Sequence, residues 1–233
     1  MIASRFELVI FDCDGVLVDS EPIINQAHAH VLTACGYPIN EKDLVERFCG
    51  MSDPEMLKII EREWGHALPT SYAERVGLMI EAGFHQSLAP IEGVSEALDS
   101  LTLPICVASS SSLEQIRQKL KITGLLGPFG DRLFSATMVA RGKPAPDLFL
   151  YAAQRLRTAP DRCVVIEDSP AGVDAARAAR MTAIGFCGGR HCGPEHPARL
   201  QEHGAALVVD DMHELVTAIA KLTYIPARSH LQL

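Results

Sequence analysis

The chain has 233 residues, of which 48% are hydrophobic and 21% charged, and its formal net charge is −8 at pH 7. These proportions are typical of a globular protein that buries a substantial core. The acidic balance argues against a nucleic-acid partner, which requires a basic face, and no apolar run approaches the roughly 18 residues of a membrane span.

The cysteines and the N-terminus indicate a compartment. The seven cysteines are odd in number and lie mostly in apolar segments. The first apolar stretch is too short for a secretory signal and leads directly into Asp12. We therefore expect a cytoplasmic protein whose cysteines are reduced and mostly structural.

The first predicted element is a strand over residues 6–10, an apolar run of strand length with β-branched residues. Asp12 and Asp14 follow it, and Gly15 lets the backbone turn sharply. Two neighbouring acids repel each other and resist burial, so a divalent cation between them is one remedy. The simpler alternative is an Asx turn in which both acids bond only local amides, and these residues alone leave both open.

The next segment, residues 20–86, has helical patterns and no convincing strand. Ser20 is the expected N-cap of its first helix, with Pro22 in the first turn, and Gly36 ends that helix. Asn40 is the expected cap of the second. The four predicted helices cover residues 20–35, 40–48, 52–64 and 70–84.

An all-helical block between two α/β stretches predicts an inserted domain. We expect this helical cap domain over residues 16–92, with hinges at 16–20 and 88–93. The remaining residues, 1–15 and 93–233, then form one discontinuous α/β core domain.

From Gly93 onward, helices and strands alternate. Strands are predicted over 104–108, 133–136, 163–166, 182–186 and 206–209, and helices over 95–101, 113–120, 147–156, 170–180 and 212–222. Ser111 and Glu114 have the spacing of a capping box, and Ser169 with Pro170 begins the helix that follows the third of these strands. The alternation predicts a Rossmann-like parallel sheet, wound right-handedly, that carries the inserted helical bundle.

Four strand ends carry polar chemistry: Asp12 and Asp14, then Ser109, then Lys143 by way of a loop, then Glu167 and Asp168. Each has a structural interpretation when taken alone. Ser109 alone suits a helix cap, Lys143 a solvated loop, and the acidic pair a strand end before a capped helix. Because ligands of parallel sheets bind at the carboxyl ends of the strands, their common location favours a site.

These strand ends resemble the four ordered motifs of the haloacid dehalogenase (HAD) superfamily. The motifs read Asp12-x-Asp14-Gly15-x-Leu17-x-Asp19, Ser109 after an apolar strand, Gly142-Lys143-Pro144-x-Pro146-Asp147, and Glu167-Asp168-Ser169-x-x-Gly172. The helical insertion after the first motif resembles the β-phosphoglucomutase-like branch, which has a helical C1-type cap. The resemblance covers the chain from Phe6 to about Val209.

The resemblance implies a Mg²⁺-dependent phosphatase that acts on a small phosphorylated metabolite, with Asp12 as nucleophile and Asp14 as general acid and base. It gives Asp12, by its side chain, and Asp14, by its backbone carbonyl, as metal ligands. Asp168 completes the metal site, and Glu167 is either a ligand or lies behind one. Ser109, the amide of Ser110, and Lys143 are the expected phosphate-binding groups. We expect a monomer or weak homodimer with no nucleic-acid or membrane partner.

Departures from the family pattern separate the possible reactions. Asp14 argues against true dehalogenation, whose enzymes lack the second acid, and neither Lys42 nor Lys58 has the context of a phosphonatase lysine. Mutase members carry a lysine, an arginine and a histidine where this chain has Cys49, Asp53 and Ile24. Hydrolysis of a sugar, sugar-acid or polyol phosphate is therefore favoured. A sugar phosphate mutase and a non-enzymatic binding or regulatory protein remain as alternatives.

For several other residues the sequence gives weaker indications of a metal-binding or substrate-binding role. Cys187, His191, Cys192 and His196 cluster in a glycine-rich segment, which fits a zinc site, a loop that brings His191 to the substrate, or simple surface histidines, the interpretation we favour. Glu21 and Arg47 can meet substrate, but a solvated helix face is favoured for both. Trp64 is expected in the core of the helical block.

Overall fold

The computed structural model describes residues 5–48 and 53–223. Its centre is a six-stranded, all-parallel sheet in the order β3-β2-β1-β4-β5-β6. The strands are β1 (Leu8–Phe11), β2 (Ile105–Ser109), β3 (Leu133–Ser135), β4 (Cys163–Glu167), β5 (Thr182–Phe186) and β6 (Leu207–Val209). The predicted fold class is confirmed.

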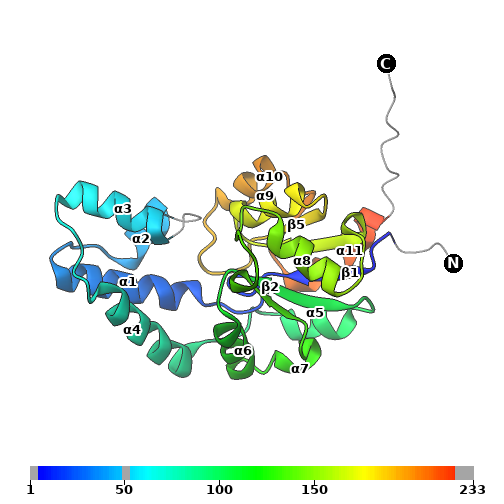
Figure 1. Ribbon diagram of the computed structural model, residues 1–233, viewed down its shortest axis with the longest axis horizontal. Helices are drawn as coiled ribbons and strands as arrows, with labels where there is room; N and C mark the ends of the chain where they lie inside the picture. The colour runs from blue at the N-terminus through cyan, green and yellow to red at the C-terminus, as the bar shows by residue number, and fades with distance from the viewer. Residues whose placement is uncertain (1–4, 49–52, 224–233) are drawn as a thin grey trace, which may run out of the picture.

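Strand β1 is buried on both faces, and its side chains alternate between two cores. Val9 and Phe11 belong to one apolar cluster, and Leu8 and Ile10 to the other. The first cluster includes residues of α5 (Val94–Ser100), α6 (Leu113–Ile122), α7 (Leu126–Phe129) and α11 (Leu215–Thr223). The second includes residues of α8 (Asp147–Arg155), α9 (Pro170–Ala178) and α10 (His196–Glu202). The sheet is thus the middle of three layers (Figure 1).

The order of the strands reverses at β1. The chain runs from β1 to β2 and β3 on one side, then returns to β4, β5 and β6 on the other. Such a switch point leaves a crevice at the carboxyl ends of the neighbouring strands, where ligands of parallel sheets bind. The fold therefore opens a site beside Asp12, the residue after β1.

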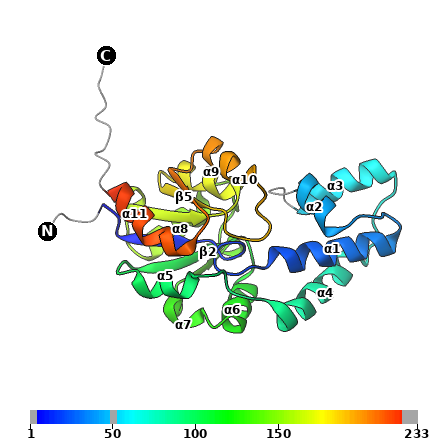
Figure 2. The ribbon, with the colours of Figure 1, turned by 180° about the vertical axis from the view of Figure 1, so that it is seen from behind.

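Four helices lie between β1 and α5: α1 (Glu21–Cys35), α2 (Glu41–Phe48), α3 (Asp53–Trp64) and α4 (Tyr72–Ser87). They extend from one end of the sheet, as both views show (Figures 1 and 2). They share an apolar cluster of their own, which includes Leu32, Leu44 and Ile60. The two connections to the core run together, since the Asp19 amide donates to the Ala89 carbonyl at 3.0 Å.

Most helix ends follow local chemistry. Gly36 has a left-handed backbone, with φ 104°, and its amide bonds the last turn of α1. The Asn40 side chain accepts the Asp43 amide at 2.9 Å, which begins α2 as predicted. The Ser169 hydroxyl accepts the Gly172 amide at 3.1 Å, as predicted for the cap of α9.

Two predicted caps are wrong. The capping box of α6 is formed by Ser112 and Gln115, one residue later than Ser111 and Glu114. Ser20 precedes α1 but makes no side-chain cap bond. In both cases the expected capping serine instead donates its hydroxyl to Asp14. A buried carboxylate accepts a charge-assisted hydrogen bond, which is stronger than a neutral cap.

Other differences are small. Two short helices, α7 and α10, were not predicted, and α4 continues to Ser87, beyond the predicted end at 84. The predicted helix over 212–222 begins as a 3₁₀ turn, Met212–Glu214, before α11. Within the described ranges, no helix combines the length and apolarity needed to cross a membrane.

Candidate functional site

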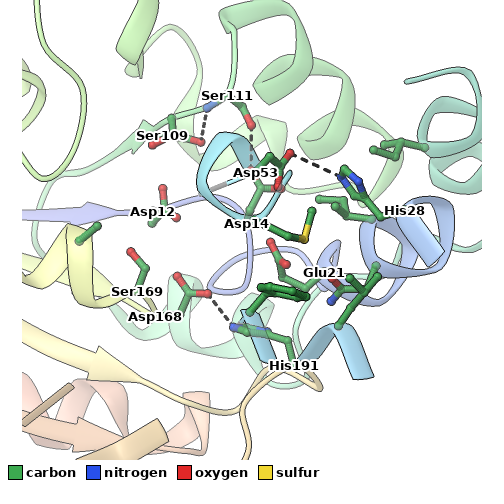
Figure 3. A pocket seen from close by; sticks show the side chains of 18 of the residues that line it. Asp12, Asp14, Glu21, His28, Asp53, Ser109, Ser111, Asp168, Ser169 and His191 are labelled. Carbon is green, nitrogen blue, oxygen red and sulfur yellow. Dashed lines mark hydrogen bonds and ion pairs between the residues drawn. The ribbon is translucent and has the colours of Figure 1, made fainter. Parts of the chain in front are cut away.

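The polar strand ends meet at a cavity of about 660 Å³ between the sheet edge and the four helices. Figure 3 shows Asp12, Asp14, Ser109 and Asp168 gathered there, although they come from three different strand ends. Six of the seven predicted site residues line the cavity: Asp12, Asp14, Ser109, Ser110, Lys143 and Asp168. The seventh, Glu167, is 0% exposed and lies behind them.

Asp12 is a buried carboxylate with one cationic neighbour. Its side chain is 11% exposed, and the Lys143 ammonium donates to Oδ1 at 2.8 Å. Burial raises the pKa of Asp12 well above its usual range, Lys143 opposes this, and the charges of Glu167, Asp168 and Asp14 add to it. Asp12 therefore needs more positive charge than Lys143 supplies in order to ionise readily.

Lys143 is shared between Asp12 and Glu167. Its side chain is 5% exposed, its ammonium lies 5.0 Å from the centre of the Phe149 ring, and it ion-pairs with both carboxylates. Burial lowers the pKa of Lys143, but the two carboxylates raise it by more than burial lowers it. The pKa of Lys143 is therefore above its usual range. The lysine is charged and held in place.

Glu167 is anchored from both sides. One of its oxygens pairs with Lys143, and the other accepts the Ser169 amide at 2.9 Å and the Ser169 hydroxyl at 2.8 Å. Only glycine fits at position 172, because a Cβ there would lie 1.9 Å from the Glu167 carboxyl carbon. This environment suits a residue that orients Lys143 from behind the cavity.

Asp14 is held by three donors, none of which was predicted to contact it. Both of its oxygens lie 2.5 Å from the Lys119 ammonium, while Ser111 donates at 2.9 Å and Ser20 at 2.6 Å. Although burial raises the pKa of Asp14, Lys119 and the two hydroxyls lower it more, so the net shift is downward. Asp14 is a carboxylate in this state.

Lys119 comes from α6 and is 3% exposed. Sequence reasoning missed it, although a signal was present. Lys119 follows Ile116 by three residues and precedes Leu120, and both of those are fully buried. A lysine at this helical spacing points to the core side of the helix, where it needs an acidic partner.

Asp168 is bound by two histidines. His191 Nε2 lies 2.9 Å from Asp168 Oδ2, and His196 Nε2 lies 2.5 Å from the Asp168 carbonyl oxygen. The favoured interpretation of these histidines as surface residues is wrong, because they are 7% and 3% exposed. His191 lines the cavity, as the substrate-loop alternative expected. Gly15, with φ +72°, packs so closely that a Cβ there would lie 2.0 Å from Asp168 Oδ2.

The glycine-rich segment also carries Cys192, whose Sγ lies 3.3 Å from His191 Nε2. Ligand atoms of His191, Cys192 and His196 lie within 4.8 Å of one another, so the geometry does not contradict the zinc alternative. Both histidines, however, already contact Asp168. Cys187, the fourth residue of that alternative, does not belong to the group.

Ser109 and Ser110 lie where β2 ends. Ser109 is 1% exposed, and its hydroxyl accepts the Ser111 amide at 3.1 Å. Ser110 is exposed and also lines the cavity. The loop therefore presents a hydroxyl and the backbone just before α6, an arrangement that suits an anion.

The acidic residues fit a hard divalent cation. Carboxylate oxygens of Asp12, Glu167 and Asp168 all lie within 4.8 Å of one another, and all three residues are buried. Mg²⁺ prefers oxygen ligands, and its charge would offset the mutual repulsion that raises the pKa of Asp12. The donor set is thus consistent with Mg²⁺.

Three predictions for the helical block have different outcomes. Glu21 lines the cavity and is not on a solvated face. Arg47 is on a solvated face, 39% exposed and paired with Glu63, as favoured. Trp64 is half-buried against Tyr37 and His66. Cys49 lies outside the described residues.

Comparisons with known proteins agree on one family. The model of the haloacid dehalogenase-like hydrolases matches residues 6–180. The chain is 33% identical over 196 residues to a 6-phosphogluconate phosphatase of Escherichia coli (strain K12), covering 83% of this chain and 89% of that protein. It is 30% identical over 180 residues to hexitol phosphatase B of the same strain, with coverages of 75% and 81%. A crystal structure of a haloacid dehalogenase-like protein of unknown function from Agrobacterium tumefaciens superposes with a TM-score of 0.88 at 40% identity, covering 93% of this chain and 99% of that one.

A double-mutant cycle tests the Asp14–Lys119 pair. We expect Lys119→Met to destabilise the fold by about 3–5 kcal/mol, because it leaves a buried carboxylate without its cation. Adding Asp14→Asn should recover much of that loss. Urea unfolding measures all three variants. Arg117→Met, which removes an exposed ion pair with Asp131, is the control and should cost less than about 1 kcal/mol. Strictly additive losses at positions 14 and 119 would contradict the pairing.

The Glu21 carboxyl predicts a pH dependence of stability. Burial raises its pKa from 4.5 to about 7, so the folded state binds more protons than the unfolded state between these values. Stability carried by Glu21 is therefore complete below pH 4.5 and declines as pH rises through 7. Relative to Glu21→Gln, the wild type should lose about 2 kcal/mol between pH 5 and pH 8, less than the full shift gives because the side chain is partly exposed. Urea unfolding at both pH values checks this, with exposed Glu46→Gln as the pH-independent control.

Proposed function

Because the chain belongs to the haloacid dehalogenase-like hydrolase family, we propose that it is a Mg²⁺-dependent phosphatase of small phosphorylated metabolites. The substrates we propose are sugar, sugar-acid or polyol phosphates. One observation carries the proposal: Asp12 lines the cavity with Lys143 on one oxygen, and Asp14 and Asp168 line the same cavity. This is the set of groups that hydrolysis of a phosphate monoester through a phosphorylated aspartate requires.

In the proposed first step, a carboxylate oxygen of Asp12 attacks phosphorus and the bond from phosphorus to the ester oxygen breaks. Asp14 is a carboxylate while it is bound to Lys119, so in this proposal it leaves that ammonium and takes up a proton from solvent before it donates the proton to the leaving alkoxide. In the second step, water attacks the aspartyl-phosphate, Asp14 takes up a proton from that water, and the bond from phosphorus to Asp12 breaks. Inorganic phosphate and the alcohol are the products.

The remaining residues bind and orient. The side chains of Asp12 and Asp168 and the backbone carbonyl of Asp14 would hold Mg²⁺, whose positive charge would let two anions approach each other. Lys143 neutralises charge on the transferring group and orients Asp12. Ser109 and the amide of Ser110 hold phosphate oxygens. Glu167 keeps Lys143 in place.

We propose that residues 16–92 form a cap domain that closes over this site. The cavity walls come partly from α1, α2 and α3, so a movement of these helices changes access to Asp12. Ser20 lies in the predicted hinge and donates to Asp14. Cap position is thereby connected to the environment of the proposed acid and base.

The mutase alternative lacks support in the cavity. Ile24 and Asp53 line it at positions where mutases carry a histidine and an arginine, and neither can grip a second phosphate. The non-enzymatic alternative is disfavoured because Asp12, Asp14, Lys143 and Asp168 are all present and assembled. We place the enzyme in the cytoplasm, where phosphorylated metabolites occur, with no nucleic-acid or membrane partner.

Replacement of the proposed nucleophile gives a direct test. We expect Asp12→Asn to abolish turnover of p-nitrophenyl phosphate, because an amide cannot form the phosphorylated intermediate. Phosphate release with Mg²⁺ measures the activity, and circular dichroism verifies that the variant is folded. Asp161→Asn, in the turn before β4 on the surface, is the matched control. Undiminished activity of Asp12→Asn would end the aspartyl-phosphate proposal.

Metal removal gives a second test. After treatment with EDTA the protein should lose phosphate release, and added Mg²⁺ should restore it, because the acidic cluster then regains its cation. Stoichiometric phosphate release from a panel of esters separates hydrolysis from mutase activity, in which the phosphate stays on the sugar. Full activity in the presence of EDTA would exclude the metal role.

A further inference from the structure

The part of the cavity farthest from Asp12 is built by the helical block, and its polar groups carry no fixed positive charge. Glu21, Asn25 and His28 lie on one face of α1 at helical spacing, and all three line the cavity. Asp53 joins them from the start of α3. Figure 3 shows Glu21, His28 and Asp53 across the cavity from Asp12.

The cations of the cavity are already committed. Its lining contains two lysines, no arginine and three histidines, and of the histidines His191 is already paired with Asp168 at 2.9 Å. Lys119 is bound to Asp14, and Lys143 to Asp12 and Glu167. Arg47, the arginine of α2, faces away and pairs with Glu63. The undescribed residues 49–52 read Cys-Gly-Met-Ser and bring no charge of their own.

His28 does not alter this balance. Its Nδ1 lies 2.7 Å from the Tyr72 hydroxyl, and its Nε2 lies 3.5 Å from Asp53 Oδ2. Nε2 is buried and has no hydrogen-bond partner within the described part of the chain. Any positive charge on this ring is therefore matched by Asp53, and the ring nitrogen remains available to a ligand hydroxyl.

We infer that this enzyme selects substrates whose end distal to the phosphate is a neutral polyhydroxyl chain, and that Glu21 and Asp53 reject a distal carboxylate or second phosphate. The inference rests on the proposed function and narrows it. Carboxylate, amide and imidazole groups pair well with hydroxyls, which both donate and accept hydrogen bonds. An anion placed beside Asp53, and beside Glu21 at a pH where that carboxyl is ionised, finds like charge, and the cations of the cavity are already paired with the core acids.

Two similar phosphatases are named for substrates that differ at the distal end. One is named for 6-phosphogluconate and the other for hexitol phosphates. A gluconate 6-phosphate carries a carboxylate at the end far from its phosphate, and a hexitol 6-phosphate carries a hydroxymethyl group there. Overall similarity to both proteins leaves the choice open. The charge of the helical block decides it in favour of the neutral chain.

Two substrates isolate the distal group. Glucitol 6-phosphate and 6-phosphogluconate share the carbon chain and its configuration and differ only at C1. We expect the wild type to favour glucitol 6-phosphate by at least about tenfold in kcat/KM, which corresponds to about 1.4 kcal/mol. A ratio near one, or a preference for 6-phosphogluconate, would overturn the inference.

Charge variants test which residues determine the ratio of kcat/KM for glucitol 6-phosphate to kcat/KM for 6-phosphogluconate. At pH 8, where Glu21 is mostly ionised, Asp53→Asn and Glu21→Gln should each reduce the ratio of the two kcat/KM values about threefold or more. Asp53→Lys should raise kcat/KM for 6-phosphogluconate relative to glucitol 6-phosphate. Glu46→Gln makes the same change of net charge on exposed α2, outside the cavity, and should leave the ratio unchanged. A ratio in Asp53→Lys equal to that of the wild type would contradict the role of Asp53.

The same measurements keep the two proposals apart. p-Nitrophenyl phosphate has no charged distal group, so the wild type and the Glu46→Gln control should hydrolyse it at similar rates if the phosphatase proposal holds. Failure of the wild type to release phosphate from any ester, p-nitrophenyl phosphate included, would refute the phosphatase proposal itself. Hydrolysis of p-nitrophenyl phosphate together with a preference for 6-phosphogluconate would refute only the inferred selectivity.

Discussion

Four carboxylates converge on the carboxyl edge of the sheet, and the site depends on how their charges are compensated. Asp12, Asp14, Glu167 and Asp168 are mostly buried, where like charges repel strongly and water cannot solvate them. Two buried lysines reduce the cost. Lys143 comes from the loop before α8 and pairs with Asp12 and Glu167, while Lys119 comes from α6 and pairs with Asp14.

The two lysines approach from opposite faces of the sheet, because α6 packs on one apolar cluster and α8 on the other. Their effects differ as well. Lys119 serves one carboxylate alone and lowers its pKa. Lys143 is divided between two carboxylates, and the pKa of Asp12 stays raised. The uncompensated negative charge is thus greatest at Asp12, which is the position where a divalent cation is most stabilising.

Sequence reasoning identified the strand ends because they are local signals. A β-branched run followed by acids, as at Asp12 or Asp168, can be identified in the sequence as a strand with an acidic end before the fold is known. Once a parallel sheet is inferred, its topology brings such ends together. The family resemblance then assigned their roles, and the family and fold class are now confirmed.

The missed features depend on contacts between distant segments. Ser111 was expected to cap α6, yet Asp14, 97 residues earlier, draws its hydroxyl away. Lys119 has the spacing of a core-facing residue of α6, but its partner cannot be identified until the position of Asp14 is known. His191 lies in a segment with no periodic pattern, so neither its burial nor its contact with Asp168 was predictable. Each miss is a polar group whose partner is distant in sequence.

The need to compensate the buried core carboxylates also separates the residues of the proposed reaction from the residues of the proposed substrate selectivity. The core must use every nearby cation to hold its own acids, so Lys119 and Lys143 have no capacity left for the far end of a substrate. The proposed recognition there falls to α1 and α3, whose Glu21, Asn25, His28 and Asp53 line the cavity. His28 pairs with Tyr72 and Asp53 and not with a core carboxylate, so this pair can change with little disturbance of the reaction groups. A family with one chemistry can then acquire many substrates by altering charge in the helices beside the sheet.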